Sequence, residues 1–322
     1  MLQRVRDWQL VLMRRGSLPA VERALAGRTL ALLGDPRPEV MTLEGMQFCQ
    51  VPAGAFWMGG DEHDSAKPLH RVELPYAYCI GRYPVTVAQW REFLVMTGHA
   101  PDDARSLQGR DNDPVTDVTL HDAQRFCQAL TQSWNGLLPA GWVVALPSEA
   151  EWEKAARGGD SLPGETLSVT VSRQGLQLPV SVSALPMSNV QARRYPWGDK
   201  NDIAERANVE SAIGETSAVG CYPAGAGPYG CEDISGNVWE WTRSLWGTAL
   251  FKPAFKYPYD PDDGLREDPA AGDDVLRVVR GSSWLDHSDF ARCAFRSGER
   301  PVSRNYLGFR VVLRSASVLP HP

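Results

Sequence analysis

The sequence predicts a mixed α+β fold that is rich in loops, with short strands and a few helices. Three observations support this prediction. The 322 residues include 29 Gly and 24 Pro, which favour turns. They also include 11 Trp, whose buried indole rings can organise a core where regular elements are short. Stretches of strand-like alternation and of helical periodicity follow one another along the chain without a tandem repeat.

The composition is that of a soluble globular protein, with 43% hydrophobic and 22% charged residues. A formal net charge of −6 argues against nucleic acid or an anionic membrane as the main partner. Charges run through the first residues and no apolar stretch reaches spanning length, so we expect neither a signal peptide nor a membrane helix.

Six cysteines are spread along the chain without a Cys-x-x-Cys pair. This spacing favours free, buried thiols in a reducing cytoplasm, which is the location we expect. One alternative stays open: a Gly/Pro-rich loop joins Cys221 to Cys231, and these two could form a disulfide. The cysteines are Cys49, Cys79, Cys127, Cys221, Cys231 and Cys293.

Residues 1–40 are predicted to form an N-terminal helical extension. Residues 2–15 follow helical spacing, and Gly16 is expected to end this first helix. Ser17 is expected to cap a second helix that runs to Leu33. We expect the apolar stripe of this pair to pack on its own domain, and docking onto a partner protein is the alternative.

Residues 41–322 are predicted to form the main domain. It opens with alternating stretches that predict strands, as in "MQFCQVPAGAFWMGG". Capping residues and apolar spacing predict amphipathic helices further on, and Ser148, with Glu151 three residues later, marks the clearest start. The insertion 160–193 alternates again and predicts a hairpin that turns near Gln174–Gly175. The expected helices are Val87–Leu94, 118–134 and 146–159.

Several segments, taken in order, resemble the formylglycine-generating-enzyme/sulfatase-modifying domain. The resemblance extends over about Met46 to Leu313 and implies a C-type-lectin-like fold of that type. The segments are "VPAGAFWMGG", "YPVTVAQWREF", "LPSEAEWEKAARGG", "RYPWGD", "GCEDISGNVWEW" and "VVRGSSW…GFRVV".

The resemblance also bears on chemistry. The enzyme of this family binds copper through two cysteines, and here Asp286 and Ala291 stand at those positions, with Cys293 displaced. Related iron enzymes carry a His cluster in a helical part, whereas the first His here is His63. We therefore expect no copper and no enzymatic activity. An enzyme or accessory module with altered, non-copper chemistry is the alternative.

A structural calcium site is implied by the same resemblance. Its ligands would be the carboxylates of Asp233 and Glu240 and the carbonyls of Gly236 and Val238, oxygen donors that suit this ion. The alternative is that Glu240 is a buried carboxylate bonded to backbone amides.

The segment 281–313 resembles the variable proteins of diversity-generating retroelements. Its frame reads "W……ARCA.R….P..R….GFRVV", and adenine replacement in Asn codons excludes Lys, Gln, Glu, Met and Trp at the positions between. We expect the frame residues Trp284, Cys293 and Phe309 to be buried. The proposed variable, ligand-binding positions are Leu285, Asp286, His287, Ser288, Asp289, Phe290, Ser297, Gly298, Val302, Ser303, Asn305 and Tyr306.

The function predicted from these features is non-enzymatic binding of a ligand, expected to be a protein, by a hypervariable surface. Phe290 and Tyr306 would be its aromatic anchors. Two alternatives remain besides the altered enzyme. The segment could be a solvated loop without a ligand, or the chain could be a sensor domain whose N-terminal helices dock onto a signalling partner.

Overall fold

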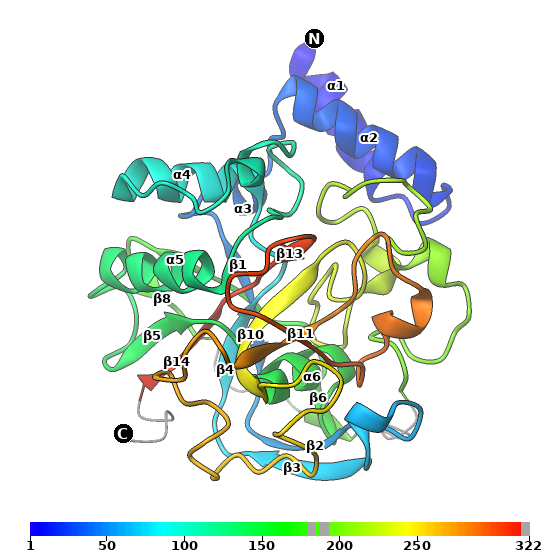
Figure 1. The fold of residues 1–322 in the computed structure, drawn as a ribbon. Helices are drawn as coiled ribbons and strands as arrows, with labels where there is room; N and C mark the ends of the chain where they lie inside the picture. The colour runs from blue at the N-terminus through cyan, green and yellow to red at the C-terminus, as the bar shows by residue number, and fades with distance from the viewer. Residues whose placement is uncertain (179–183, 187–192, 317–322) are drawn as a thin grey trace.

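The computed structural model describes residues 1–178, 184–186 and 193–316, and Figure 1 shows an α+β molecule of short elements joined by long loops. None of its helices within these ranges is long and apolar enough to cross a membrane. The helices are α1 (Leu2–Met13), α2 (Ala20–Leu33), α3 (Pro38–Met41), α4 (Val87–Thr97), α5 (Leu120–Ser133) and α6 (Glu149–Arg157). The strands are β1 (Gln47–Val51), β2 (Gly54–Met58), β3 (His70–Leu74), β4 (Tyr78–Gly81), β5 (Trp142–Ala145), β6 (Ser161–Pro163), β7 (Ser168–Ser172), β8 (Gly175–Leu176), β9 (Ala184–Pro186), β10 (Trp239–Gly247), β11 (Leu276–Arg280), β12 (Ser297–Glu299), β13 (Leu307–Gly308) and β14 (Val312–Ser315).

The larger sheet has six strands in the order β5-β14-β4-β1-β7-β8, and it lies between helices. Alternate side chains of its strands point to opposite faces. Phe48 and Leu313 belong to the core under α4 and α5, whereas Val51 and Val312 belong to the core under α6. A second sheet has the order β12-β11-β10-β13, and β2 pairs with β3 in a separate hairpin.

Three helices begin at capping boxes, and the sequence predicts the one at Ser148. Thr86, Thr119 and Ser148 each form a capping box at the start of α4, α5 and α6. Helix α4 continues past the predicted end at Leu94, because the left-handed residue that stops it is Gly98, at φ +68°.

The N-terminal helices form a hairpin that packs on its own domain. Arg23 is buried against that domain, donating from Nε to the Cys221 carbonyl at 2.8 Å and from Nη2 to the Glu205 carbonyl at 2.9 Å. The predicted cap at Ser17 is wrong, because α2 begins at Ala20 with Pro19 as N-cap and no side-chain cap. The outer side of α1 leaves apolar side chains exposed, among them Trp8.

The insertion contains the predicted hairpin. Val171 pairs with Leu176 and Ser172 with Gly175, so the chain turns at residues 173–174. Strand β7 also pairs with β1, which makes this part of the insertion an extension of the six-stranded sheet. Residues 179–183 and 187–192 of the predicted insertion lie outside the described residues.

All six cysteines are free and buried. The open alternative of a Cys221–Cys231 disulfide is therefore not realised. Cys221 packs with the N-terminal helices, and its thiol donates to the Arg23 carbonyl at 3.7 Å. Cys231 belongs instead to the core around α6.

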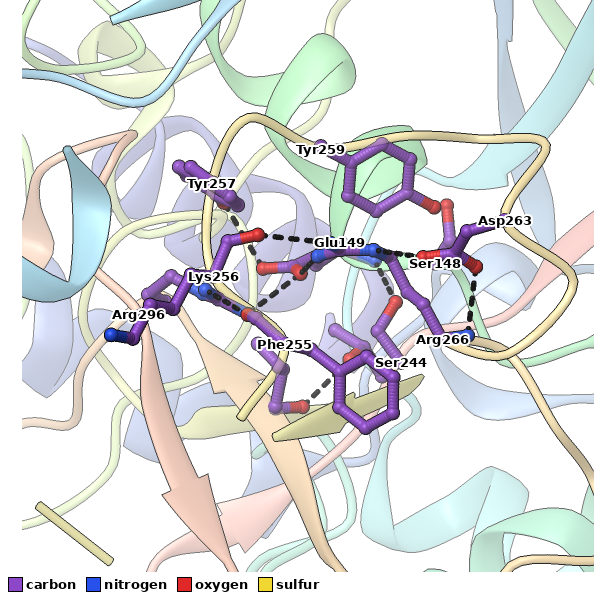
Figure 2. A network of polar contacts seen from close by, with 12 residues as sticks. Ser148, Glu149, Ser244, Phe255, Lys256, Tyr257, Tyr259, Asp263, Arg266 and Arg296 are labelled. Carbon is purple, nitrogen blue, oxygen red and sulfur yellow. Dashed lines mark hydrogen bonds and ion pairs between the residues drawn. The ribbon is translucent and has the colours of Figure 1, made fainter. Parts of the chain in front are cut away.

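Helix α6 differs most from its prediction. An amphipathic helix would leave its glutamates in water, yet all nine residues are buried. Each glutamate is paired with two arginines. Figure 2 shows the first of them, Glu149, among Tyr257, Ser244, Arg266 and Arg296. The carboxylate–guanidinium pairs are Glu149 with Arg266 and Arg296, Glu151 with Arg243 and Arg314, and Glu153 with Arg157 and Arg280.

Burial of these charges is tolerated because each is paired and hydrogen-bonded. Burial alone would raise the pKa of Glu151, but Arg243, Arg314 and the Ser148 backbone lower it to about 2. Because this folded-state pKa lies below the unfolded one of about 4.5, the stabilisation is complete above pH 4.5 and is lost as the pH falls toward 2.

We predict that Glu151→Gln lowers the free energy of unfolding by about 3–5 kcal/mol at pH 7, because buried Arg314 loses its counter-charge and Arg243 keeps only its pair with Glu267. Urea unfolding followed by circular dichroism measures this. Glu22→Gln, an exposed change in α2, is the matched control and should alter stability by less than about 0.5 kcal/mol. Equal, small changes in both variants would refute the role given to the pair.

Candidate functional site

The segment 281–313 contributes to a pocket of about 420 Å³. Half of the proposed variable positions line it, and they come from two separated stretches of the segment. These residues are Leu285, Asp286, Phe290, Ser297, Asn305 and Tyr306. Trp239, Val279, Phe295, Glu299 and Leu307 complete the wall.

The four-stranded sheet brings the two stretches together. Strand β12 pairs antiparallel with β11, and β13 pairs parallel with β10, so β12 and β13 lie at opposite edges of one sheet. The loop after β11 and the short helix Ser288–Ala291 precede β12 in the chain. Residues far apart in sequence therefore converge over β10 and β11.

Asp286 holds the loop above this sheet in place. Its Oδ2 atom accepts hydrogen bonds from Trp239 Nε1 at 2.8 Å, from the Ser283 backbone N–H at 3.1 Å and from the Ser283 hydroxyl. The Asp286 carbonyl accepts from the Glu210 N–H at 2.8 Å. Asp286 thus lines the pocket and also fixes its wall.

Aromatic rings form much of the remaining wall. Phe295 lies between Phe290 and Trp239, with ring centroids 4.6 and 5.9 Å away. Tyr306 contacts Trp284 edge to face at 5.6 Å. Tyr306 also has φ +58°, a left-handed conformation that is costly for a bulky residue and is concentrated at functional sites.

The expected frame residues differ in burial. Cys293 and Phe309 are fully buried, whereas Trp284, whose ring contacts Tyr306, is only half-buried, so this part of the prediction is wrong. Gly298 does not fit a variable, exposed position. It is buried, and a Cβ atom built there would lie 2.4 Å from Cγ of Trp246. Gly298 is therefore part of the scaffold.

The other proposed positions lie outside the pocket lining. His287 is exposed and caps the short helix, its Nδ1 accepting from the Asp289 N–H at 3.3 Å. Val302 is 53% exposed. The remaining three, Ser288, Asp289 and Ser303, are half-buried. Contact of any of the twelve proposed residues with a ligand stays a prediction.

Sequence reasoning missed several lining residues. The Trp-Glu-Trp run at residues 239–241 predicts core positions, yet the indole of Trp239 is half-buried at the pocket. The codon rule excludes Glu from variable positions and so predicts no ligand contact for Glu299, and no sequence pattern indicates Phe295. The alternation of β10 was the usable signal, since it places Trp239 and fully buried Trp241 on one face, two residues apart.

The residues proposed for calcium do not fit a cation. The Glu240 carboxylate accepts from Arg310 Nε and Nη2, both at 2.7 Å, and from Trp152 Nε1 at 2.7 Å. Arg310 Nη2 also donates to the Asp233 carbonyl at 3.1 Å. A guanidinium thus supplies the positive charge there. Glu240 is a buried carboxylate, as the alternative held, although its partners are side chains rather than backbone amides.

The copper positions offer no thiolate pair. Ala291 has no ligand atom in its side chain, and the Asp286 carboxylate is held by Trp239 and Ser283. Burial raises the pKa of Cys293 to about 12, so this thiol is not a nucleophile at neutral pH. Within the described ranges, no three His, Cys, Asp or Glu residues form a group that could hold a metal ion.

Residues 35–315 match the family model described as the sulfatase-modifying factor enzyme 1-like domain. The hercynine oxygenase of Mycolicibacterium smegmatis is 30% identical over 292 residues, which cover 79% of this chain and 58% of that protein. The chain thus spans little more than half of this relative. The mouse formylglycine-generating enzyme is 26% identical over 360 residues, covering 92% of this chain and 82% of the relative.

Among solved structures, variable protein 1 of Treponema denticola superposes with a TM-score of 0.56 at 22% identity, covering 84% of this chain and 95% of that one. The fold is therefore the predicted C-type-lectin-like α+β fold of the formylglycine-generating-enzyme type. The prediction that the protein is not an enzyme is contradicted, because hercynine oxygenase and formylglycine-generating enzyme are both enzymes.

We predict that Asp286→Ala lowers the free energy of unfolding by about 1–3 kcal/mol, because Trp239 and Ser283 lose their acceptor. Val302→Ala, an exposed change in the same segment, should cost less than about 0.5 kcal/mol. Urea titration of both variants measures these changes in the free energy of unfolding. An Asp286→Ala protein as stable as Val302→Ala would show that the carboxylate does not hold the loop.

We further predict a pH dependence at Asp233. Burial raises its pKa to about 7, from about 3.8 when unfolded, so the folded state binds the proton more tightly. The free energy of unfolding should therefore fall as the pH rises from about 4 to 7. Asp233→Asn, which keeps an acceptor for the Gly220 N–H, should make this fall shallower, whereas exposed Asp262→Asn should not. If the free energy of unfolding of Asp233→Asn fell with pH as steeply as that of the parent protein, the prediction would be wrong.

Proposed function

The chain belongs to the family of the sulfatase-modifying factor enzyme 1-like domain, and on this premise we propose that its aromatic pocket binds a ligand. The observation that supports the proposal is convergence. Residues from two stretches of the segment 281–313 line one pocket of about 420 Å³. Pockets of this size with apolar walls and a few fixed polar groups are typical of binding sites.

The contacts available define the ligand chemistry. Leu285, Phe290 and Tyr306 present apolar and aromatic surface, and Leu285 and Tyr306 are 47% and 39% exposed. Asn305 and Glu299 add polar groups beside it. Aromatic anchors with a polar rim are the usual composition of a protein interface, so we propose a segment of another protein as the ligand.

We further propose that the exposed positions vary between copies of the gene. Asn305 and Tyr306 are exposed, and their neighbours Leu307 and Gly308 pair with β10, so substitutions here would change the surface without changing the sheet. A near-copy of the codons for residues 284–310, with adenines at the proposed positions and beside a reverse transcriptase gene, would support variation. Its absence would refute it.

The binding test uses a peptide library displayed on phage, selected on the immobilised full chain. We predict that Tyr306→Ala and Phe290→Ala each weaken a selected peptide by about 30-fold, as expected for anchors worth about 2 kcal/mol. Val95→Ala, an exposed change in α4 outside the proposed segment, should leave the affinity unchanged. Circular dichroism confirms that each variant is folded. Peptides insensitive to both aromatic substitutions would place binding elsewhere.

A second candidate function is supported by the hercynine oxygenase relative. The same pocket would then hold the substrate of an oxygenation. The test supplies the purified chain with hercynine, iron(II), dioxygen and a thiol that provides the electrons dioxygen takes up, and follows the products by mass spectrometry. Turnover lost in Tyr306→Ala and kept in Val95→Ala would favour this candidate over peptide binding.

A further inference from the structure

A second pocket, of about 500 Å³, lies on the other side of Phe295. The Phe295 ring contacts Phe290 at 4.6 Å toward the first pocket and His63 at 4.7 Å toward the second. The loop after β2, the end of α6 and the residues around 193–199 enclose this second pocket. Four arginines line it: Arg157, Arg193, Arg194 and Arg292.

Arg157 is the buried member of this group, with its side chain only 4% exposed. It donates from Nη1 to the Arg193 carbonyl at 3.0 Å and from Nη2 to the Gly59 carbonyl at 2.8 Å and to Glu153 at 3.0 Å. Its Nε atom is buried and has no acceptor within the part of the chain that is described. A buried charged donor without a partner is costly and calls for an acceptor.

Two further arginines, Arg292 and Arg193, have hydrogen-bond donors without an acceptor among the described residues. Arg292 pairs with Glu62 through Nη1 and with Asp289 through Nη2 at 2.6 Å, yet its Nε is also buried without an acceptor among the described residues. Arg193 donates from Nη1 to the Pro196 carbonyl at 2.7 Å and forms no ion pair with any residue of the described ranges.

Three carboxylates line the pocket, those of Asp61, Glu62 and Asp199, and the last two are already engaged. Glu62 is shared between Arg292 and Arg194, whose Nε lies 3.2 Å from Glu62 Oε1. Asp199 accepts from the Arg194 backbone N–H at 2.9 Å. Donors therefore remain after these carboxylates have been used. The volume also exceeds what one small inorganic ion fills and matches pockets that hold small organic molecules.

We propose that this pocket binds the oxyanion group, a carboxylate or a phosphate, of a small organic acid. The oxyanion would accept from Arg193, whose guanidinium group has no carboxylate partner within the described ranges, and the nearby charges of Arg157 and Arg292 would add to the attraction. Charge-assisted bonds from guanidinium groups are the strong, directional contacts that such groups need. This site is distinct from the aromatic pocket and does not depend on the function proposed for it.

The experiment measures anion binding to the full chain by isothermal titration calorimetry. One arm uses inorganic phosphate and the other acetate, each against chloride at equal ionic strength. Arg193→Gln should weaken binding of the preferred anion about tenfold, since one charged contact is lost. The control is Arg173→Gln, an exposed arginine outside the pocket, 92% exposed, which should bind like the parent.

The outcomes distinguish a phosphate ligand from a carboxylate ligand, and the arginine-lined pocket from the aromatic pocket. Preference for phosphate identifies a phosphoester as the ligand class, and preference for acetate identifies a carboxylic acid. Tyr306→Ala should leave anion binding unchanged, which keeps this test independent of the peptide experiment. Binding of neither anion above chloride, or equal losses in Arg193→Gln and Arg173→Gln, would overturn the proposal.

Discussion

The arrangement of this molecule depends on the pairing of three buried glutamates with arginines. Glu149, Glu151 and Glu153 follow one another at every second position of α6, so they point to different sides of a buried helix. A buried carboxylate needs its own counter-charge and hydrogen bonds. Five of the six partner arginines come from residues 243–314, far along the chain, and one comes from α6 itself. The charges of one short helix therefore determine where the loop-rich C-terminal half must pass.

Buried arginine–glutamate pairs also fix the chain around the pockets. Arg296 reaches Glu149, and Arg310 reaches Glu240, each at 2.7 Å. In the segment 281–313, many residues that precede Arg296 or lie between Arg296 and Arg310 do not pack in the core, and their side chains can face the solvent. Gly298 shows the limit of that freedom, because Trp246 occupies the space a side chain would need. A rigid frame with adaptable residues between its fixed points suits a surface devoted to recognition.

Local signals in the sequence were sufficient for some elements and not for others. The capping box of Ser148 and Glu151 predicted the start of α6 correctly, because the groups that form it lie within four residues. The burial of α6 could not be predicted, since alternating glutamates resemble a solvated face until distant arginines are known. The convergence of Leu285 and Tyr306 on one pocket followed from the family frame, whereas the contribution of Trp239 required the pairing of β10 with β13. The prediction of no enzymatic activity went too far, because a missing copper ligand pair excludes one mechanism and not every reaction.

The position of β14 also constrains how the protein can form during synthesis. This strand is among the last described elements of the chain, yet it lies between β5 and β4 inside the six-stranded sheet, and its Arg314 pairs with Glu151. Until residue 314 leaves the ribosome, the sheet is split and the α6 carboxylates lack part of their counter-charge. The core therefore cannot close progressively behind the ribosome. The facing edges of β4 and β5 stay unpaired until residues 312–315 have been made, and chaperones that shield strand edges should matter more to this protein than to one built from local contacts.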